Sequence, residues 1–452
     1  MVMVGLEIHG YINTSEKLFC RCKSIHGTKF SKPNTNICPI CTGQPGAKPM
    51  LPNKSAMDKA IQIALILNCK INQKLFWQRK HYDWPDLPKG YQNTISGSHA
   101  SPVGENGKFL NIRIREAHLE EDPAAWNPKT GRIDYNRSGS PLIEIVTEPD
   151  FKSSEEVVDW LKQLIQTLSY IKALDKNSGI KADVNVSIPE LKGKRVEVKN
   201  INSLKNIKKT IESEIIRQKK EIPKVIETRM FDESKGITIK MRDKEGAMDY
   251  RFISDPDLPV MKIEKERIEK IRSKLPETPQ EKLQKLIKRY KIEKRYAEVL
   301  TKKLEIVEFF EQVIEKTNPK ISTRWVTEEL LSVLNYNKKE LEEVEISPKH
   351  FIELIEMIDK GKITELKAKE ILRSWKEKSF SPKEEAKNFS SISNTDEIEK
   401  IAKEVMKENE KAVDDFKNGR KESLNFLIGK VMQKTNKRAD FKTAREVLEK
   451  LM

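Results

Sequence analysis

The chain has 452 residues, of which 37% are hydrophobic and 34% charged, a composition typical of soluble globular proteins and not of disordered or fibrous ones. Its length predicts two to four domains. No apolar run is long enough to span a membrane and no secretory signal is visible, so we expect a cytoplasmic protein with no membrane partner. The net charge of +16 suits a nucleic-acid partner, although a lysine-rich solubilising surface explains it equally well.

The first predicted element is a strand at residues 4–10, which read VGLEIHG. Its apolar residues share one parity, whereas Glu7 and His9 share the other, so a carboxylate and an imidazole are expected side by side on one face. Taken alone, the stretch is better explained as a half-buried strand whose polar face meets water.

Four cysteines follow within residues 20–41, spaced as C-x-C and C-x-x-C: Cys20, Cys22, Cys38 and Cys41. In a cytosolic chain, paired cysteines around a loop favour a closed tetrahedral zinc site of structural type over disulfides. Four reduced structural cysteines are the alternative.

Up to about residue 260 the chain alternates between strands and helices. Period-two segments are predicted at 109–122, 132–150, 180–190 and 194–203, and helices at 153–174 and 204–222, the first with a cap at Ser153. This order favours an α+β fold around a largely antiparallel sheet. The remainder is Lys/Glu-rich and helical, with breaks at Pro276–Pro279 and at the Ser-rich segment 379–397.

Acidic residues recur in these predicted strands at the positions that alternate with the apolar ones. Glu144 interrupts an apolar strand, where a lone carboxylate is costly unless it is paired or metal-bound. Together with Glu7, His9 and the acids of 116–122, it favours a Mg²⁺ site that also holds substrate phosphates. A surface sheet with cross-strand ion pairs is the alternative. No P-loop or G-x-S-x-G motif is present, so any nucleotide chemistry would need a sheet platform, with basic residues against the phosphates: Lys89, Arg113, Arg115 and Arg137.

The strings VGLEIH, LFCRC…CPICTGQPG, KHYDWPDLPKGYQ, HLEEDPA, DYNRSGSPLIEIVTEPD, ADVNVSI, EVKNINS and MRDKEGAMDYRFISDPDLP occur in the order typical of one family. In these motifs the chain resembles the B subunit of the glutamyl/aspartyl-tRNA(Gln/Asn) amidotransferase over essentially its whole length. The resemblance implies a catalytic cradle like that of glutamine synthetase and the guanidino kinases at 1–292, with the zinc loop at 20–41. A helical domain at 293–393 and a small helical tRNA-binding domain at 394–452 would follow.

The same resemblance implies ATP-dependent transamidation of misacylated Glu-tRNA(Gln), Asp-tRNA(Asn) or both. The chain would phosphorylate the side-chain carboxylate, and ammonia from an amidase-type A subunit (the glutaminase) would displace the phosphate. This glutaminase, a small C subunit and the misacylated tRNA are the implied partners, an aminoacyl-tRNA synthetase is a further candidate, and ATP, Mg²⁺ and Zn²⁺ are the implied cofactors. A zinc-stabilised tRNA-binding or assembly protein without catalysis is the alternative.

Site residues carried over from the family motifs fall into four groups. The catalytic group is Glu7, His9, Lys89, Glu120 and Glu144. The nucleotide-binding group is Lys80, Tyr82, Asp86, Arg137, Asp183, Asn185, Glu197 and Lys199. The Mg²⁺ ligands are Glu7, His9, Glu144 and Glu120 or Glu121. The tRNA-binding group is Lys430, Lys434, Lys437 and Arg438.

A parity slip between Ile114 and Glu121 suggests a bulge, so either Glu120 or Glu121 could point inward, and register favours Glu120. The loop 93–107 departs from the family pattern, as does Lys181, which stands where the family has arginine, so the role of that loop stays open.

Overall fold

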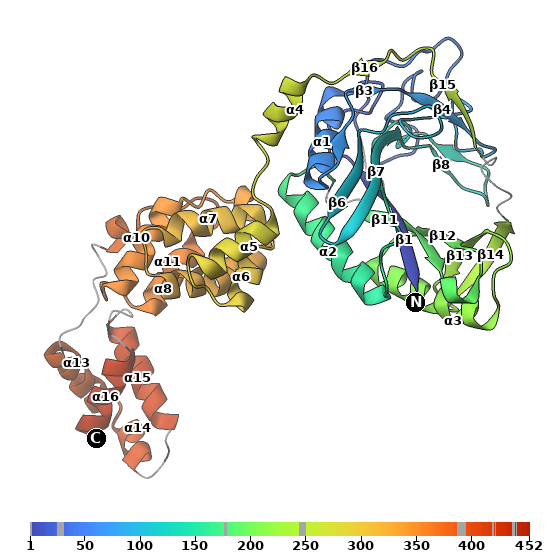
Figure 1. Ribbon diagram of the computed structural model, residues 1–452. Coiled ribbons are helices and arrows are strands. Elements are labelled where there is room, and N and C mark those ends of the chain that lie inside the picture. The colour runs from blue at the N-terminus through green and yellow to red at the C-terminus, as the bar shows by residue number, and fades with distance from the viewer. Residues whose placement is uncertain are drawn as a thin grey trace. The chain divides into compact units, whose positions relative to one another are not determined.

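The computed structural model describes residues 2–24, 31–175, 179–243, 250–386, 395–417, 420, 422–435, 439 and 441–452. The chain divides into two compact units, Met1–Glu277 and Thr278–Met452 (Figure 1).

A 12-stranded sheet forms the centre of the first unit among the described residues. Its path runs β14-β13-β12-β11-β1-β10-β7-β5-β4-β15, with β6 paired to both β7 and β2. All its pairs are antiparallel except β12–β13. The strands of this sheet are β1 (Met3–Tyr11), β2 (Lys70–Ile71), β4 (Gln78–His81), β5 (Gln92–Thr94), β6 (Gly104–Phe109), β7 (Ile112–Glu121), β10 (Pro141–Thr147), β11 (Ile180–Ser187), β12 (Val196–Ile201), β13 (Glu227–Asp232), β14 (Ile237–Asp243) and β15 (Arg251–Ser254). Two small sheets pair β3 (Lys74–Leu75) with β16 (Met261–Lys262) and β8 (Ala125–Trp126) with β9 (Ile133–Asp134).

Strand β1 has the two-faced character that its sequence predicts. Val4, Leu6 and Ile8 are at most 1% exposed and belong to the main hydrophobic core, whereas Glu7 and His9 lie on the other face and are partly exposed. The apolar face is covered by helices α1 (Lys54–Ile66), α2 (Ser154–Tyr170) and α3 (Leu204–Lys220), and α4 (Lys265–Arg272) contacts α1 (Figure 1). The polar face is therefore the one left to carry chemistry.

Helix α2 begins where its sequence signal places it. The Ser153 side chain accepts a hydrogen bond of 3.1 Å from the main-chain N–H of Glu156, which satisfies one of the free donors of the first turn. Two acids in that turn also suit the positive end of the helix dipole.

The expected irregularity in β7 is present. Val146 of β10 pairs with Glu116, but the next residue, Thr147, pairs with Ile114, so β7 holds one extra residue at this point. The bulge resets the alternation of β7 and so determines which of its acids face the polar side.

Apart from an isolated β-bridge between Glu345 and Lys378, the described secondary structure of the second unit is helical. Its elements are α5 (Pro279–Lys288), α6 (Lys294–Leu300), α7 (Leu304–Ile314), α8 (Pro319–Arg324), a π-helical turn η3 (Trp325–Leu330), α9 (Leu331–Tyr336), the 3₁₀ turn η4 (Leu341–Glu343), α10 (Pro348–Asp359), α11 (Glu365–Ser374), α12 (Pro382–Ala386), α13 (Thr395–Glu408), α14 (Glu410–Lys417), α15 (Glu422–Lys434) and α16 (Phe441–Leu451). Helices α13–α16 share a hydrophobic core of their own. A large, mostly antiparallel sheet followed by a helical region confirms the predicted α+β organisation. The predicted domain boundaries at 292 and 393 stay predictions.

Candidate active site and cysteine cluster

Three strands far apart in sequence place two histidines on either side of one carboxylate. His9 of β1 lies opposite Glu144 of β10, which in turn lies opposite His118 of β7. Glu144 Oε2 is 3.4 Å from His9 Nε2 and 3.1 Å from His118 Nε2. The buried acid of β10 is therefore paired rather than isolated, which removes most of the cost of burying it.

Glu120 completes a first cluster with these groups. One donor atom each from His9, Glu120 and Glu144 lies within 4.8 Å of the other two. Glu120 Oε2 is buried and has no hydrogen-bond partner among the described residues, an arrangement that is costly without a ligand. Two carboxylates and an imidazole fit a divalent cation that also binds phosphate oxygens.

A second cluster lies beside the first and consists of Glu7, Asp183 and Glu197. Glu7 lies opposite Asp183 across β1 and β11, and Lys199 Nζ is 3.1 Å from Asp183 Oδ2 and 2.9 Å from Glu197 Oε1. Asn185 Nδ2 donates to Glu7 Oε1 at 3.1 Å. The residues around Glu7 are thus four that were predicted to bind the nucleotide: Asp183, Asn185, Glu197 and Lys199.

One cavity of about 300 Å³ reaches both clusters. Its lining includes His9 and Glu120 of the first cluster and Asp183 of the second, with Asp86, Arg137, Lys181 and Lys199 around them. Arg113 and Arg115 are not in this lining; they form exposed ion pairs with Asp150 and Glu148.

Burial and mutual charge perturb these groups strongly. Burial alone would lower the pKa of His9, but the adjacent Glu144 carboxylate raises it to about 9. The same balance raises the pKa of His118 to about 10, and the two imidazoles hold the pKa of Glu144 well below its usual range despite burial. Burial and then the charge of Glu144 raise the pKa of Glu7. The charge of Glu144 thus favours the protonated form of both imidazoles, and a cation bound at His9 would compete with its proton.

The motif around residues 80–89 borders this pocket from β4 and the turn after it. The charges of Glu120 and Glu144 raise the pKa of Lys80 against the effect of burial. The Lys80 ammonium lies 4.6 Å from the centre of the Tyr250 ring. The Tyr82 ring packs edge-on against Tyr250 at 5.8 Å. Burial raises the pKa of Asp86, a cavity residue, to about 6.

Glu121 points away from both clusters. Its carboxylate pairs with Lys89 and accepts a hydrogen bond of 2.9 Å from the main-chain N–H of Asn93. Lys89 also donates to Asn93 Oδ1 at 2.6 Å, and Asn93 in turn bonds to Asp255. The structure therefore brings Glu120, and not Glu121, to His9.

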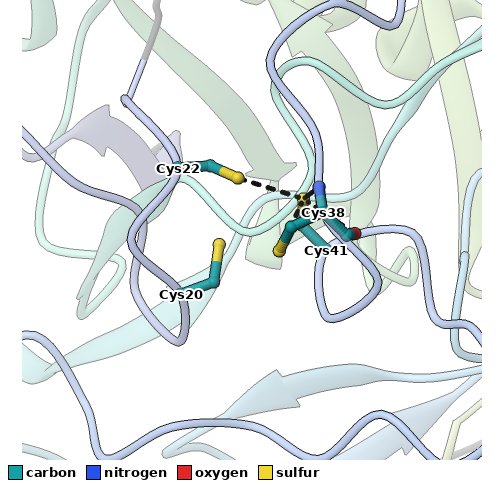
Figure 2. Close-up of side chains that lie close together, drawn as sticks. All are labelled: Cys20, Cys22, Cys38 and Cys41. Atoms are coloured by element: carbon teal, nitrogen blue, oxygen red, sulfur yellow. Dashed lines mark hydrogen bonds between the residues drawn. The ribbon is translucent and has the colours of Figure 1, made fainter.

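The four cysteines of the loop 20–41 gather at one point (Figure 2). All are free thiols, and Cys41 Sγ lies 3.8 Å from Cys38 Sγ and 4.0 Å from Cys22 Sγ. A tetrahedral ion with metal–sulfur bonds of about 2.3 Å needs sulfur atoms about 3.8 Å apart, so the spacing fits a zinc ion. Hydrogen bonding from Cys20 lowers the pKa of Cys41 to about 4, so that one thiolate is already favoured.

Sequence reasoning assigned no role to His118, which pairs with Glu144, or to Asn93 and Asp255, which belong to the network around Glu121 and Lys89. His118 lies two residues before Glu120 in β7 and therefore on the same face of the strand, so its place on the polar face was predictable from the sequence. Asn93 and Asp255 lie in segments without a period and were recognisable only from the fold. Lys17, fully buried beside the cysteines, was also missed.

The predicted tRNA-binding residues of the last helices differ in their surroundings. Lys434 is paired with Glu404 and Glu408, at 3.3 and 2.6 Å, whereas Lys430 lies over the ring of Phe426. Lys437 and Arg438 lie outside the described residues.

An acid-lined sheet with lysine and arginine around the same cavity favours a class of enzyme that handles phosphate groups with divalent cations. Within the described residues no helix is both long and apolar enough to cross a bilayer.

Comparison with known proteins narrows this class. Residues 2–269 match the GatB/GatE catalytic domain and residues 308–452 match the GatB domain. The chain is 43% identical to the B subunit of the aspartyl/glutamyl-tRNA(Asn/Gln) amidotransferase from Methanococcus maripaludis, over 99% of this chain and 97% of that protein. It is 44% identical to those from Methanocaldococcus jannaschii (98% and 96%) and Methanothermobacter thermautotrophicus (96% and 97%). The chain belongs to this family of amidotransferase B subunits and therefore forms part of an enzyme.

Proposed function

We propose that this chain is the activating component of an amidotransferase that converts Glu-tRNA(Gln), Asp-tRNA(Asn) or both to the correctly amidated tRNA. The side-chain carboxylate of the misacylated residue attacks the γ-phosphorus of ATP and ADP leaves. Ammonia then attacks the carbonyl carbon of the acyl phosphate, inorganic phosphate leaves, and the amide forms. An amidase-type A subunit would supply the ammonia, a small C subunit would complete the assembly, and a synthetase is a further candidate partner. Because its substrates are aminoacyl-tRNAs, we place this activity in the cytoplasm.

The observation that carries this proposal is the meeting of two carboxylate clusters at one cavity. In this proposal His9, Glu120 and Glu144 would hold one Mg²⁺, and Glu7, Asp183 and Glu197 would hold a second; the closeness of their donor atoms supports both assignments. Bound Mg²⁺ would neutralise charge on the phosphates and align attacking and leaving oxygens.

The chain's own cations have a defined part in the same step. Lys199 sits between two carboxylates at the cavity wall, and Arg137 faces the cavity close to Asp122, with Arg137 Nε 3.4 Å from Asp122 Oδ2. Both would contribute positive charge at the cavity wall that offsets the charge of bound phosphates. A cation bound by Asp183 and Glu197 would release the Lys199 ammonium from these carboxylates.

Fold and domain assignments are part of the proposal. The curved antiparallel sheet with one acid-lined face supports a cradle like that of glutamine synthetase, which performs the same acyl-phosphate chemistry. We assign residues 1–292 to this cradle, 293–393 to a helical domain and 394–452 to a tRNA-binding domain. The sulfur spacing of Cys20, Cys22, Cys38 and Cys41 supports a structural zinc ion, because four thiolates leave no open ligand position.

The test is an assay of both misacylated tRNAs side by side with a competent amidase partner, ATP and glutamine. Wild type should form amidated aminoacyl-tRNA from at least one of them, and ADP release should depend on the tRNA. Absence of turnover on both, with the tRNA still bound, would leave the non-catalytic binding protein as the better explanation. ATP consumption without tRNA would instead indicate a free-standing kinase.

A further inference from the structure

Lys17 is a buried cation that the proposed reaction does not use. It is 1% exposed and ranks among the largest fully buried side chains of the described chain. Its ammonium donates to two main-chain carbonyls, Asn36 O at 3.1 Å and Tyr135 O at 3.3 Å. Among the described residues no carboxylate lies within ion-pair distance of it. An unpaired buried ammonium is expensive, so its charge needs an explanation.

The surroundings of Lys17 are those of the cysteine cluster. Its main-chain N–H donates to Cys22 O at 2.9 Å, and Asn36, which accepts from its ammonium, lies two residues before Cys38. Around the point where Gly139 would carry a Cβ lie Cβ of Cys41 at 3.7 Å, the Cδ carbon of Lys17 at 3.8 Å and Oε2 of Glu121 at 4.0 Å. The carboxylate of Glu121 is itself paired with Lys89. Lys17 therefore touches both halves of the metal loop.

A divalent ion bound by four thiolates carries two net negative charges. Such a centre, partly enclosed by protein, is stabilised by a cation held close to it and kept from solvent. We propose that Lys17 is the charge-compensating residue of the four-cysteine metal centre, an inference that rests on the zinc site proposed above.

The same residue ties this centre to the edge of the acidic cavity. Tyr135 O, the second acceptor of the ammonium, starts the turn that holds Arg137 and Ser138. Ser138 Oγ donates to Cys41 O at 2.8 Å, and Arg137 faces the cavity.

The test uses the full-length chain and two variants, Lys17→Met and, as matched control, Lys23→Met. Lys23 is an exposed lysine in the same loop. Zinc affinity is measured by chelator competition, and the melting temperature is measured with zinc and after its removal. Lys17→Met should weaken zinc binding at least tenfold and lower the melting temperature of the zinc-loaded form. In the metal-free form, where one thiolate at most is favoured, Lys17→Met should lower the melting temperature much less, because there is less negative charge for the ammonium to compensate.

A role confined to packing and hydrogen bonding gives a different pattern. Lys17→Met would then lower the melting temperatures of the loaded and metal-free forms equally, or would fail to fold where metal-free wild type folds. Either result, or an unchanged zinc affinity, overturns the proposal. If wild type itself binds no stoichiometric zinc, the metal assignment fails first, and this is visible before any variant is made.

Discussion

Glu144→Gln separates the functional interpretation of the polar sheet face from a purely structural one. The Glu144 carboxylate pairs with the imidazoles of His9 and His118. It raises the pKa of His9 from 6.5 to about 9 against the opposing effect of burial. With the neutral amide, the His9 pKa should fall toward 6.5, because burial lowers it and the remaining charges of Glu120 and Asp183 raise it less than Glu144 does. At about 1.4 kcal/mol per pKa unit, a full return to 6.5 is a loss of about 3–4 kcal/mol. The His9 side chain is 23% exposed, so solvent screening reduces that figure.

The sign of this effect can be checked in metal-free protein. A histidine whose pKa is raised in the folded state stabilises the fold below pH 6.5, and this stabilisation is lost as pH rises through about 9. Thermal unfolding of wild type should therefore show a melting temperature that falls between pH 6.5 and 10, and the fall should be much smaller in Glu144→Gln. The contributions of His9 and His118 do not add, because both depend on the same carboxylate.

The catalytic consequence is measured as amidated tRNA formed in the complete system. Removing a proposed metal-binding carboxylate should lower the rate at least about 100-fold. Glu148→Gln, which changes an exposed acid just beyond the same strand, should stay within a few-fold of wild type. A folded Glu144→Gln enzyme with near wild-type turnover and unchanged pH dependence would refute the metal-site interpretation.

Three further outcomes are expected. Apparent Mg²⁺ affinity, measured by titration calorimetry between pH 7 and 9, should rise with pH because the proton on His9 must leave before a cation binds; a flat or falling affinity contradicts this. Gly43→Ala should destabilise the chain by about 1–3 kcal/mol in denaturant unfolding, since its φ is +65° and a Cβ would lie 2.3 Å from a main-chain oxygen, whereas Gly46→Ala, with no atom within 4 Å, should cost less; equal effects would show that close packing is not the cause. Lys430→Ala should weaken tRNA binding and reduce its salt dependence by about one charge, more than Lys434→Ala, whose ammonium is already paired; the reverse order would place the tRNA elsewhere.

Local features of the structure were predictable from the sequence alone. Alternation along β1 separates Glu7 and His9 from Leu6 and Ile8, and the serine cap defines the start of α2, because side-chain direction and helix capping depend on a few consecutive residues. The clustering of the four cysteines likewise followed from short spacings and thiol chemistry. These features need no knowledge of which strands become neighbours.

Only the tertiary structure determined how the acids combine. The row His9–Glu144–His118 exists because β10 lies between β1 and β7, an order that depends on long-range burial of the common core. The bulge in β7 sends Glu120 to His9 and Glu121 to Lys89. The parity slip in the sequence favoured Glu120, but only the pairing of β7 with β10 fixed which of the two acids reaches His9. The burial of Lys17 was equally invisible, since a lysine is normally solvated, and only packing against the segments that hold Asn36 and Tyr135 removes it from water.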